Sequence, residues 1–136
     1  MSVKPFGSGV PLVIDTSAWN RQREPEVQGR WESTIRAGLL ASCPAAALEI
    51  LAATRDEREF TVIEEALAAL PQAPLSAAVG LAALSACREL GARRRIPAAD
   101  YLIAAAAAER GFGILHADKH FDLLEGVLGF ESVWIG

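Results

Sequence analysis

The sequence lacks any hydrophobic stretch long enough to cross a membrane, since a membrane-spanning helix needs about 20 consecutive apolar residues. Its first nine residues contain one lysine but no apolar core of the kind that a secretion signal requires. We therefore expect no membrane association and a cytoplasmic location.

Cysteine is scarce: there are two, Cys43 and Cys87, with no CxxC spacing and no histidine nearby. Isolated cysteines in apolar surroundings exclude a disulfide-rich scaffold and predict buried, reduced thiols. Positive charge is also scarce, because the net charge of the 136 residues is −4. Such a chain does not bind nucleic acid through broad electrostatic attraction, although it can carry a local basic surface.

The motifs of several common enzyme classes are missing. The chain has no GxSxG, no GxxxxGK and no cysteine near a histidine. These absences exclude a serine-hydrolase elbow, a phosphate-binding P-loop and a thiol nucleophile of the usual kind. Acidic side chains are therefore the candidates for chemistry.

Short apolar runs alternate with helical segments along the chain, a pattern typical of a parallel sheet covered on both faces. The predicted strands are residues 12–15, 39–43, 73–75, 112–117 and 132–135. The predicted helices are residues 25–37, 44–54, 56–70, 77–90, 97–110 and 118–124. We expect an α/β fold, a three-layer α/β/α sandwich with a mostly parallel sheet of roughly five strands. This single domain spans residues 11–136 and follows a flexible lead-in over residues 1–10.

Two of these helices have one apolar face, because their apolar residues recur at helical spacing. The expected inner faces are Val27, Trp31, Ile35 and Leu39 in the first helix, and Phe60, Ile63, Leu67 and Leu70 in the helix over 56–70. Trp31 is expected in the core, and a place in a groove for a partner is the alternative.

An acid follows the first predicted strand. The run from Pro11 to Ile14 leads straight into Asp15, and the hydroxyl residues Thr16 and Ser17 come next. Open α/β sheets bind ligands at the carboxyl ends of their strands, which makes Asp15 a candidate for the functional site. Asp is also a favoured helix N-cap, so capping of the next helix is the alternative interpretation.

Two further acids stand alone in apolar helices. Glu49 is the only charged residue within residues 45–53, and Asp100 is the only one within residues 96–108. Charged side chains are rarely buried unless they are paired or bind a metal. The alternatives are a narrow solvent-exposed face for Glu49 and an interaction with the helix dipole for Asp100.

Asp118 follows the strand predicted over residues 112–117, and Asp122 lies one helical turn further on. Asp118 meets Asp15 if their strands are neighbours, because the carboxyl ends of parallel strands lie along one edge of the sheet. The alternatives are a helix cap for Asp118 and a solvated position for Asp122.

Four carboxylates at one edge repel one another, and burial would force some of them to take up protons. Divalent cations remove this repulsion. Hard carboxylate oxygens suit Mg²⁺ or Mn²⁺, which also bind substrate phosphates. The acids therefore predict a Mg²⁺ or Mn²⁺ site formed by Asp15, Glu49, Asp100 and Asp118.

Four segments resemble the four motifs of PIN-domain ribonucleases. They are residues 13–17, 48–51, 100–105 and 115–121. In length and spacing the chain is most similar to the VapC toxins of bacterial toxin–antitoxin pairs. The resemblance covers nearly all of the chain after residue 11.

The resemblance implies a PIN-like nuclease domain that hydrolyses RNA phosphodiester bonds through a metal-activated water, with the four acids as metal-binding and catalytic residues. It implies supporting roles around the site for Thr16, Ser17, His116 and Asp122. His116 stands where the family often has Thr or Ser, and His120 where it often has a second acid. We expect both histidines to be loop or supporting residues rather than metal ligands.

The resemblance also implies partners: an RNA substrate, a cognate antitoxin and a second copy of the chain in a homodimer. The antitoxin would place a helix in a groove of the toxin and a basic tail in the acidic site. Arg93, Arg94 and Arg95 are candidates for contact with the RNA backbone. The alternative for these arginines is a solvated position at the end of a helix.

Two other functions stay open. One is a catalytically inactive PIN-like module that binds RNA or protein. The other is a domain in which Asp15 accepts a phosphoryl group. Receiver domains have adjacent acids before the first loop, where this chain has Val13 and Ile14, and dehalogenase-like domains have a second Asp at the position of Ser17.

Overall fold

The sheet at the centre of the molecule has four parallel strands in the order β2-β1-β3-β4. In the computed structural model, which describes residues 3–136, the strands are β1 (Leu12–Ile14), β2 (Leu40–Ala41), β3 (Gly113–His116) and β4 (Ser132–Trp134). Val13 of β1 lies opposite Ala41 of β2 and Ile114 of β3. The strand that leads to Asp15 is therefore a direct neighbour of the strand that leads to Asp118.

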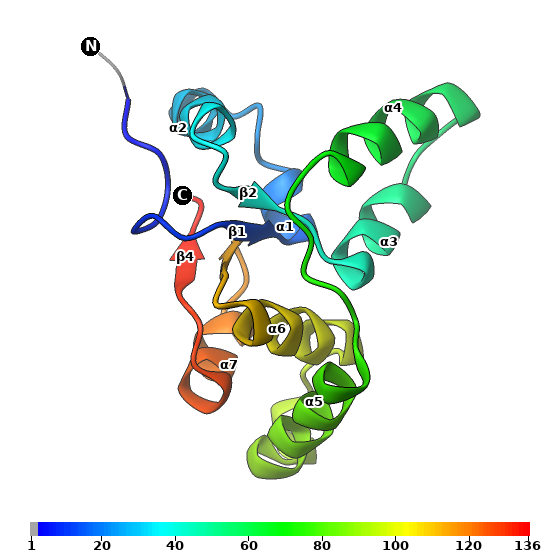
Figure 1. Cartoon of the computed structure of the whole chain (residues 1–136), viewed down its shortest axis with the longest axis vertical. Helices are drawn as coiled ribbons and strands as arrows, with labels where there is room; N and C mark the ends of the chain where they lie inside the picture. The colour runs from blue at the N-terminus through cyan, green and yellow to red at the C-terminus, as the bar shows by residue number, and fades with distance from the viewer. Residues whose placement is uncertain (1–2) are drawn as a thin grey trace.

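Helices cover both faces of the sheet (Figure 1). They are α1 (Thr16–Trp19), α2 (Pro25–Arg36), α3 (Pro44–Ala52), α4 (Glu57–Ala68), α5 (Ala77–Leu90), α6 (Ala98–Arg110) and α7 (His120–Leu128), with a short 3₁₀ helix η1 (Ala92–Arg94) between α5 and α6. α2 lies on one side of the sheet, and α5, α6 and α7 lie on the other (Figure 1). None of the helices in the described part of the chain is both long and apolar enough to span a membrane.

The core has two parts because successive side chains of a strand point to opposite faces of the sheet. Val13 and Ile114 pack with α5, α6 and α7 on one face. Leu12 and Ile14 pack with Val27 of α2 on the other. The expected three-layer α/β/α sandwich is confirmed.

The sheet has four strands rather than the expected five. Within residues 3–136, the segment 73–75 is not a strand, and the chain makes only a single parallel bridge there, between Ser42 and Gln72. Pro71 and Pro74 flank this bridge, and proline has no backbone N–H to donate to a neighbouring strand. The fifth strand therefore stops after one residue pair.

The chain forms a short helix, α1, directly after β1, where the sequence predicts a loop. Asp15 caps this helix, since its side chain accepts a hydrogen bond from the backbone N–H of Ser17. A single helical turn has too few residues to show an apolar periodicity, so this element leaves no pattern in the sequence.

Two residues expected on inner helix faces lie at the surface. Ile35 is 49% exposed and Phe60 is 37% exposed. Thr34 is buried in place of Ile35, and its hydroxyl accepts a hydrogen bond from the backbone of Phe6 and donates one to Arg30. Trp31 is buried, as expected. Near the end of α2, the buried face therefore includes Thr34 instead of the predicted Ile35.

Part of the segment expected to be a flexible lead-in packs against the domain. Phe6 is buried in the core on the α2 side, and the guanidinium of Arg30 lies 4.2 Å from the centre of its ring. Met1 and Ser2 lie outside the described residues.

The two cysteines differ in exposure. Cys43 is buried, as expected, and burial raises the pKa of its thiol. Cys87 is exposed, which contradicts the expectation that both thiols are buried. Cys87 follows the buried Ala86 on α5 and therefore points outward.

Candidate metal centre at the carboxyl edge of the sheet

Asp15 lies where β1 ends, and the backbone holds it in place. Its own N–H donates to the carbonyl of Leu115 in β3 at 3.0 Å. Its Oδ2 accepts hydrogen bonds from the Ser17 backbone N–H at 3.1 Å and from the Ser17 hydroxyl at 2.5 Å. The side chain is 95% buried, since only 5% of the residue is exposed. Helix capping and a place at the site are therefore compatible roles for this residue.

Ser17 joins the ends of two strands. Its hydroxyl donates to Asp15 and accepts a hydrogen bond at 2.9 Å from the backbone N–H of Ala117, which lies 100 residues away in the chain. This contact sets the β3–α7 loop against the β1–α1 turn. The hydroxyl of Ser17 thus links the two strand ends, and the supporting roles of Ser17 and Thr16 remain predictions.

Asp100 is buried in the first turn of α6. Burial and the charges of Asp15 and Asp118 raise the pKa of Asp100 to about 7, and the contact with His120 opposes this rise. Asp100 and Asp118 both contact Nδ1 of His120, and Asp15 ends β1, the strand next to β3.

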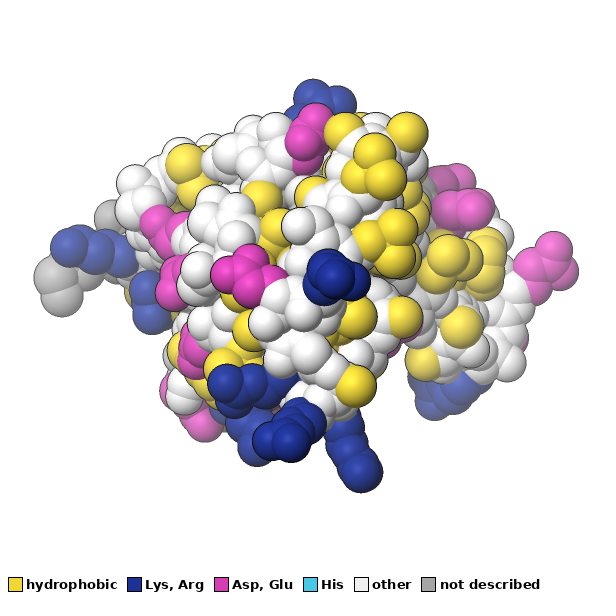
Figure 2. Space-filling model, turned by 90° about the horizontal axis from the view of Figure 1, so that it is seen from below, with side chains coloured by type: hydrophobic (Ala, Val, Ile, Leu, Met, Phe, Trp, Pro, Cys, Tyr) yellow, Lys and Arg dark blue, Asp and Glu magenta, His cyan; other side chains and the backbone are white. Residues whose placement is uncertain are grey.

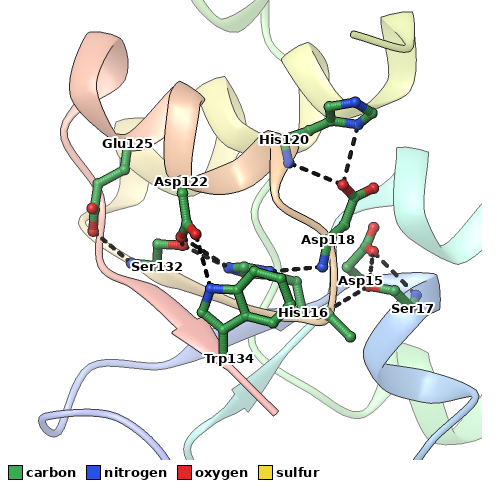
Figure 3. A network of polar contacts seen from close by, with 10 residues as sticks. Asp15, Ser17, His116, Asp118, His120, Asp122, Glu125, Ser132 and Trp134 are labelled. Atoms are coloured by element: carbon green, nitrogen blue, oxygen red, sulfur yellow. Dashed lines mark hydrogen bonds and ion pairs between the residues drawn. The ribbon is translucent and has the colours of Figure 1, made fainter. Parts of the chain in front are cut away.

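Asp118 lies on the loop after β3, between Asp15 and His120 (Figure 3). Nδ1 of His120 is 3.2 Å from Oδ1 of Asp118 and 3.3 Å from Oδ2 of Asp100. The His120 backbone N–H also donates to Oδ1 of Asp118 at 2.9 Å. One ligand atom from each of Asp100, Asp118 and His120 lies within 4.8 Å of the other two.

Glu49 approaches the acids from the solvent side. It is exposed on α3, which is the alternative that the sequence left open. Partial burial of its carboxyl, and then the charge of Asp15, raise its pKa, while Thr16 opposes the rise. Glu49 thus belongs to the same group of acids but remains open to solvent.

The acids and their surroundings fit a divalent cation. Burial, and then the charges of Asp15 and Asp118, raise the pKa of Asp100, so a positive counter-charge would favour its ionised form. The hydroxyl oxygen of Thr16, the residue after Asp15, is buried, and within residues 3–136 it has no hydrogen-bond partner. Carboxylate and hydroxyl oxygens are hard ligands of the kind that Mg²⁺ and Mn²⁺ bind.

A family model described as "PIN domain" matches residues 12–127 of the chain. The chain belongs to the PIN-domain family. Among curated relatives of this PIN domain, Ribonuclease VapC51 of Mycobacterium tuberculosis is 36% identical over 127 residues, which cover 90% of this chain and 91% of the relative. Ribonuclease VapC18 of the same organism is 31% identical over 127 residues, which cover 90% and 93%.

Solved VapBC structures have the same fold as this PIN domain. The DNA-bound VapBC of Salmonella typhimurium matches with a TM-score of 0.70 and 18% identity, over 93% of this chain and 99% of the other. VapBC-5 of Mycobacterium tuberculosis matches with a TM-score of 0.65 and 18% identity, over 92% and 98%. The expected PIN-like fold is confirmed.

Two groups of predicted residues lie outside the cluster of facing acids. Asp122 points away from the acids and binds Ser132 and Trp134 of β4 instead (Figure 3). Arg93, Arg94 and Arg95 are exposed in and just after η1. The role of each predicted residue remains a prediction.

His116 connects Asp122 to the acids through a chain of hydrogen bonds (Figure 3). Nδ1 of this fully buried histidine accepts from the Asp118 backbone N–H at 3.1 Å, so its Nε2 carries the proton and donates to the Ser132 hydroxyl at 2.6 Å. The Ser132 hydroxyl donates to Oδ1 of Asp122 at 2.8 Å. Burial lowers the pKa of His116, which favours this neutral form.

Ser132 and Trp134 are members of this network that the sequence did not indicate. The indole N–H of Trp134 donates to Oδ2 of Asp122 at 2.9 Å, and its ring lies 5.0 Å from that of His116. Their positions depend on the pairing of β3 with β4, in which His116 lies opposite Trp134. A sequence pattern does not state which residues pair across a sheet.

Proposed function

We propose that this PIN domain is a metal-dependent endoribonuclease and the toxin of a VapBC-type toxin–antitoxin pair. The observation that carries this proposal is the cluster of Asp100, Asp118 and His120 at the end of β3, next to the strand that ends at Asp15. The ribonuclease names of its VapC relatives support the activity. The VapBC structures of the same fold support a partnership with an antitoxin.

The proposed site holds Mg²⁺ or Mn²⁺ on Asp15, Glu49, Asp100 and Asp118, and a bound ion supplies water activation and neutralises the leaving oxygen. Ser17 keeps the Asp15 carboxylate at a fixed angle through two hydrogen bonds. Glu49 is the exposed member of the four proposed ligands, on α3.

The arginines near η1 are the proposed contacts for the RNA backbone. Arg93, Arg94 and Arg95 lie between α5 and α6, the helix that carries Asp100. Figure 2, seen from the side on which α5 lies, shows Lys and Arg side chains gathered along its lower edge. A local positive surface of this kind offsets the repulsion between RNA phosphates and an acidic protein.

The proposed antitoxin site is a groove of about 680 Å³ between the α1–α2 connection and α4. Trp19 forms part of its floor, and the buried Trp31 packs edge-on against Trp19 with ring centres 6.2 Å apart. Val62 and Ile63 of α4 supply apolar contacts, and the groove also contains charged residues of both signs. An amphipathic helix suits a groove with this mixture of side chains.

The proposed homodimer uses the outer face of α5. Leu81 and Leu84 are 68% and 69% exposed and lie one turn apart on this helix. Beside them is an apolar cavity of about 300 Å³, whose lining includes Leu84, Cys87 and Tyr101. A second copy of the chain would remove this apolar surface from water. The cytoplasmic location remains a prediction from the sequence.

Substitution of Asp15 tests the nuclease. Purified wild-type protein with Mg²⁺ or Mn²⁺ is expected to cut RNA, and Asp15→Asn is expected to abolish cutting while circular dichroism shows an unchanged fold. Glu64→Gln is the matched control, because Glu64 is an exposed acid of α4. Equal cutting by wild type and Asp15→Asn would show that the activity comes from a contaminant or another site.

A further inference from the structure

His120 is a nitrogen donor within a group of carboxylate oxygens. Its Nδ1 lies 3.2 Å from Oδ1 of Asp118 and 3.3 Å from Oδ2 of Asp100. The backbone N–H of the same residue holds Oδ1 of Asp118, so the loop fixes His120 and Asp118 relative to each other. Nδ1 therefore faces both acids, although the His120 side chain is still 23% exposed.

These separations match neighbouring ligands of one ion. Ligand atoms about 2.1 Å from an octahedral cation and at right angles to each other lie about 3.0 Å apart. The two distances from Nδ1 are close to this value, and the three ligand atoms of Asp100, Asp118 and His120 lie within 4.8 Å of one another.

The other histidine cannot take this role. The chain has two histidines, and both ring nitrogens of His116 are already engaged, one by the Asp118 backbone and the other by Ser132. Any nitrogen ligand from an imidazole in this protein must come from His120.

We propose that Nδ1 of His120 is a metal ligand together with Asp100 and Asp118, and that it shifts the preference of the site from Mg²⁺ toward transition-metal ions. This inference rests on the proposed metal-dependent function. Imidazole nitrogen binds divalent first-row transition metals well, whereas Mg²⁺ prefers oxygen ligands. It replaces the expectation that His120 only supports the loop.

An ion pair between a protonated His120 and the two carboxylates would have the opposite effect on metal affinity. If His120 were an imidazolium paired with the two carboxylates, it would compete with every cation for the same oxygens. Its removal would then strengthen the binding of Mn²⁺ and Mg²⁺ alike. A metal-binding imidazole instead predicts a selective loss of Mn²⁺ affinity.

Electron spin echo envelope modulation of the Mn²⁺-loaded full chain detects a nitrogen atom that is coordinated to the ion. The wild type is expected to show nitrogen-14 modulation from a coordinated imidazole, and His120→Asn is expected to lose it. Lys119→Asn is the matched control, because Lys119 is the exposed neighbour of His120 in the chain, and it is expected to keep the modulation.

Isothermal titration with MnCl₂ and MgCl₂ measures the preference. His120→Asn is expected to weaken Mn²⁺ binding on the order of ten-fold, a typical loss for a disturbed metal site, with a smaller effect on Mg²⁺. His120→Asp, which restores an oxygen donor, is expected to bring the two affinities closer together. Mn²⁺ binds nitrogen donors more weakly than the later first-row divalent ions do, so a difference between Mn²⁺ and Mg²⁺ is the smallest that the proposal predicts.

The possible outcomes distinguish a failure of the proposed role of His120 from a failure of the proposed nuclease function. Mn²⁺ binding without nitrogen modulation, or tighter binding of both ions by His120→Asn, would overturn the role of His120 and leave the nuclease intact. Failure of the wild type to bind either ion, together with RNA cutting that needs no metal, would overturn both.

Discussion

Among the acids of the site, Asp100 has a pKa that burial and neighbouring charges raise strongly. Its folded-state pKa is about 7, against 3.8 for an unperturbed carboxyl. Between these values the folded state binds more protons than the unfolded state, so stability falls as pH rises through this window. Above pH 7 the full penalty of three facing carboxylates is present.

Asp100→Asn removes this penalty, and its effect should depend on pH. In EDTA, its melting temperature is expected to exceed that of the wild type by a margin that grows from pH 4 to pH 7 and then levels off. Each kcal/mol corresponds to about 3–5 °C in a domain of this size, so the margin should reach several degrees.

His116 does not disturb this comparison. Its lowered pKa makes the unfolded state bind more protons below about pH 6.5, so it destabilises the fold as pH falls. Because both proteins contain His116, its contribution cancels in the difference between them. A margin that stays constant from pH 4 to pH 8 would contradict the assigned surroundings of Asp100.

At the scale of single residues, the sequence indicated the positions of three acids in the fold better than the contacts around them, and the roles of these acids remain predictions. Asp15 and Asp118 were predictable because each follows a buried apolar run, and Asp100 because no other charge lies near it in its helix. The link from His116 through Ser132 to Asp122 was not predictable, since it depends on the alignment of two strands. The sequence did not predict α1, because a helix of one turn shows no periodic pattern of apolar residues.

At the scale of elements, Gly113 lets β3 pack closely against its neighbours. A Cβ on Gly113 would come within 2.7 Å of the Glu131 carbonyl oxygen and within 2.7 Å of Leu12 Cδ2. The glycine lets β3 lie close to both its neighbours, and β3 carries the loop with Asp118.

Gly113→Ala is expected to destabilise the fold by about 1–3 kcal/mol, because a backbone carbonyl cannot move aside easily. Gly126→Ala is the matched control. Gly126 is exposed in α7, and a Cβ there would meet nothing within 4 Å, so alanine should stabilise the helix by about 0.5–1 kcal/mol. Unfolding in urea measures both, and equal effects of the two substitutions would refute the close approach at Gly113.

The boundaries of most elements were predictable because particular residues begin and end them. Pro25, Pro44 and Pro97 mark helix starts, and Gly111 adopts a left-handed backbone where α6 ends. The strand predicted over residues 73–75 does not form, because the apolar pattern gave no measure of how soon the prolines would end the pairing after the Ser42–Gln72 bridge.

At the scale of the whole molecule, two exposed apolar surfaces are assigned to two different partners. Val62→Glu in the groove beside α4 is expected to prevent co-purification of an antitoxin encoded by an adjacent reading frame, without changing the dimer. Leu84→Glu on α5 is expected to yield monomers in sedimentation experiments, with antitoxin binding retained. Both side chains are exposed, so neither change should unfold the domain.

Each variant is the control for the other. Loss of both interactions in either variant would show that the two surfaces are not separate. A wild-type protein that sediments as a monomer at micromolar concentration would contradict the proposed homodimer.

The hydrogen bond from Ala117 to Ser17 spans 100 residues, and β1 pairs with β3 across a similar length of chain. Pairings between such distant segments form slowly, since a long loop must close before any contact compensates for it. During synthesis, Asp15 leaves the ribosome long before Asp118 exists. A nascent chain therefore cannot bring Asp15 and Asp118 together until β3 and the loop after it have been synthesised.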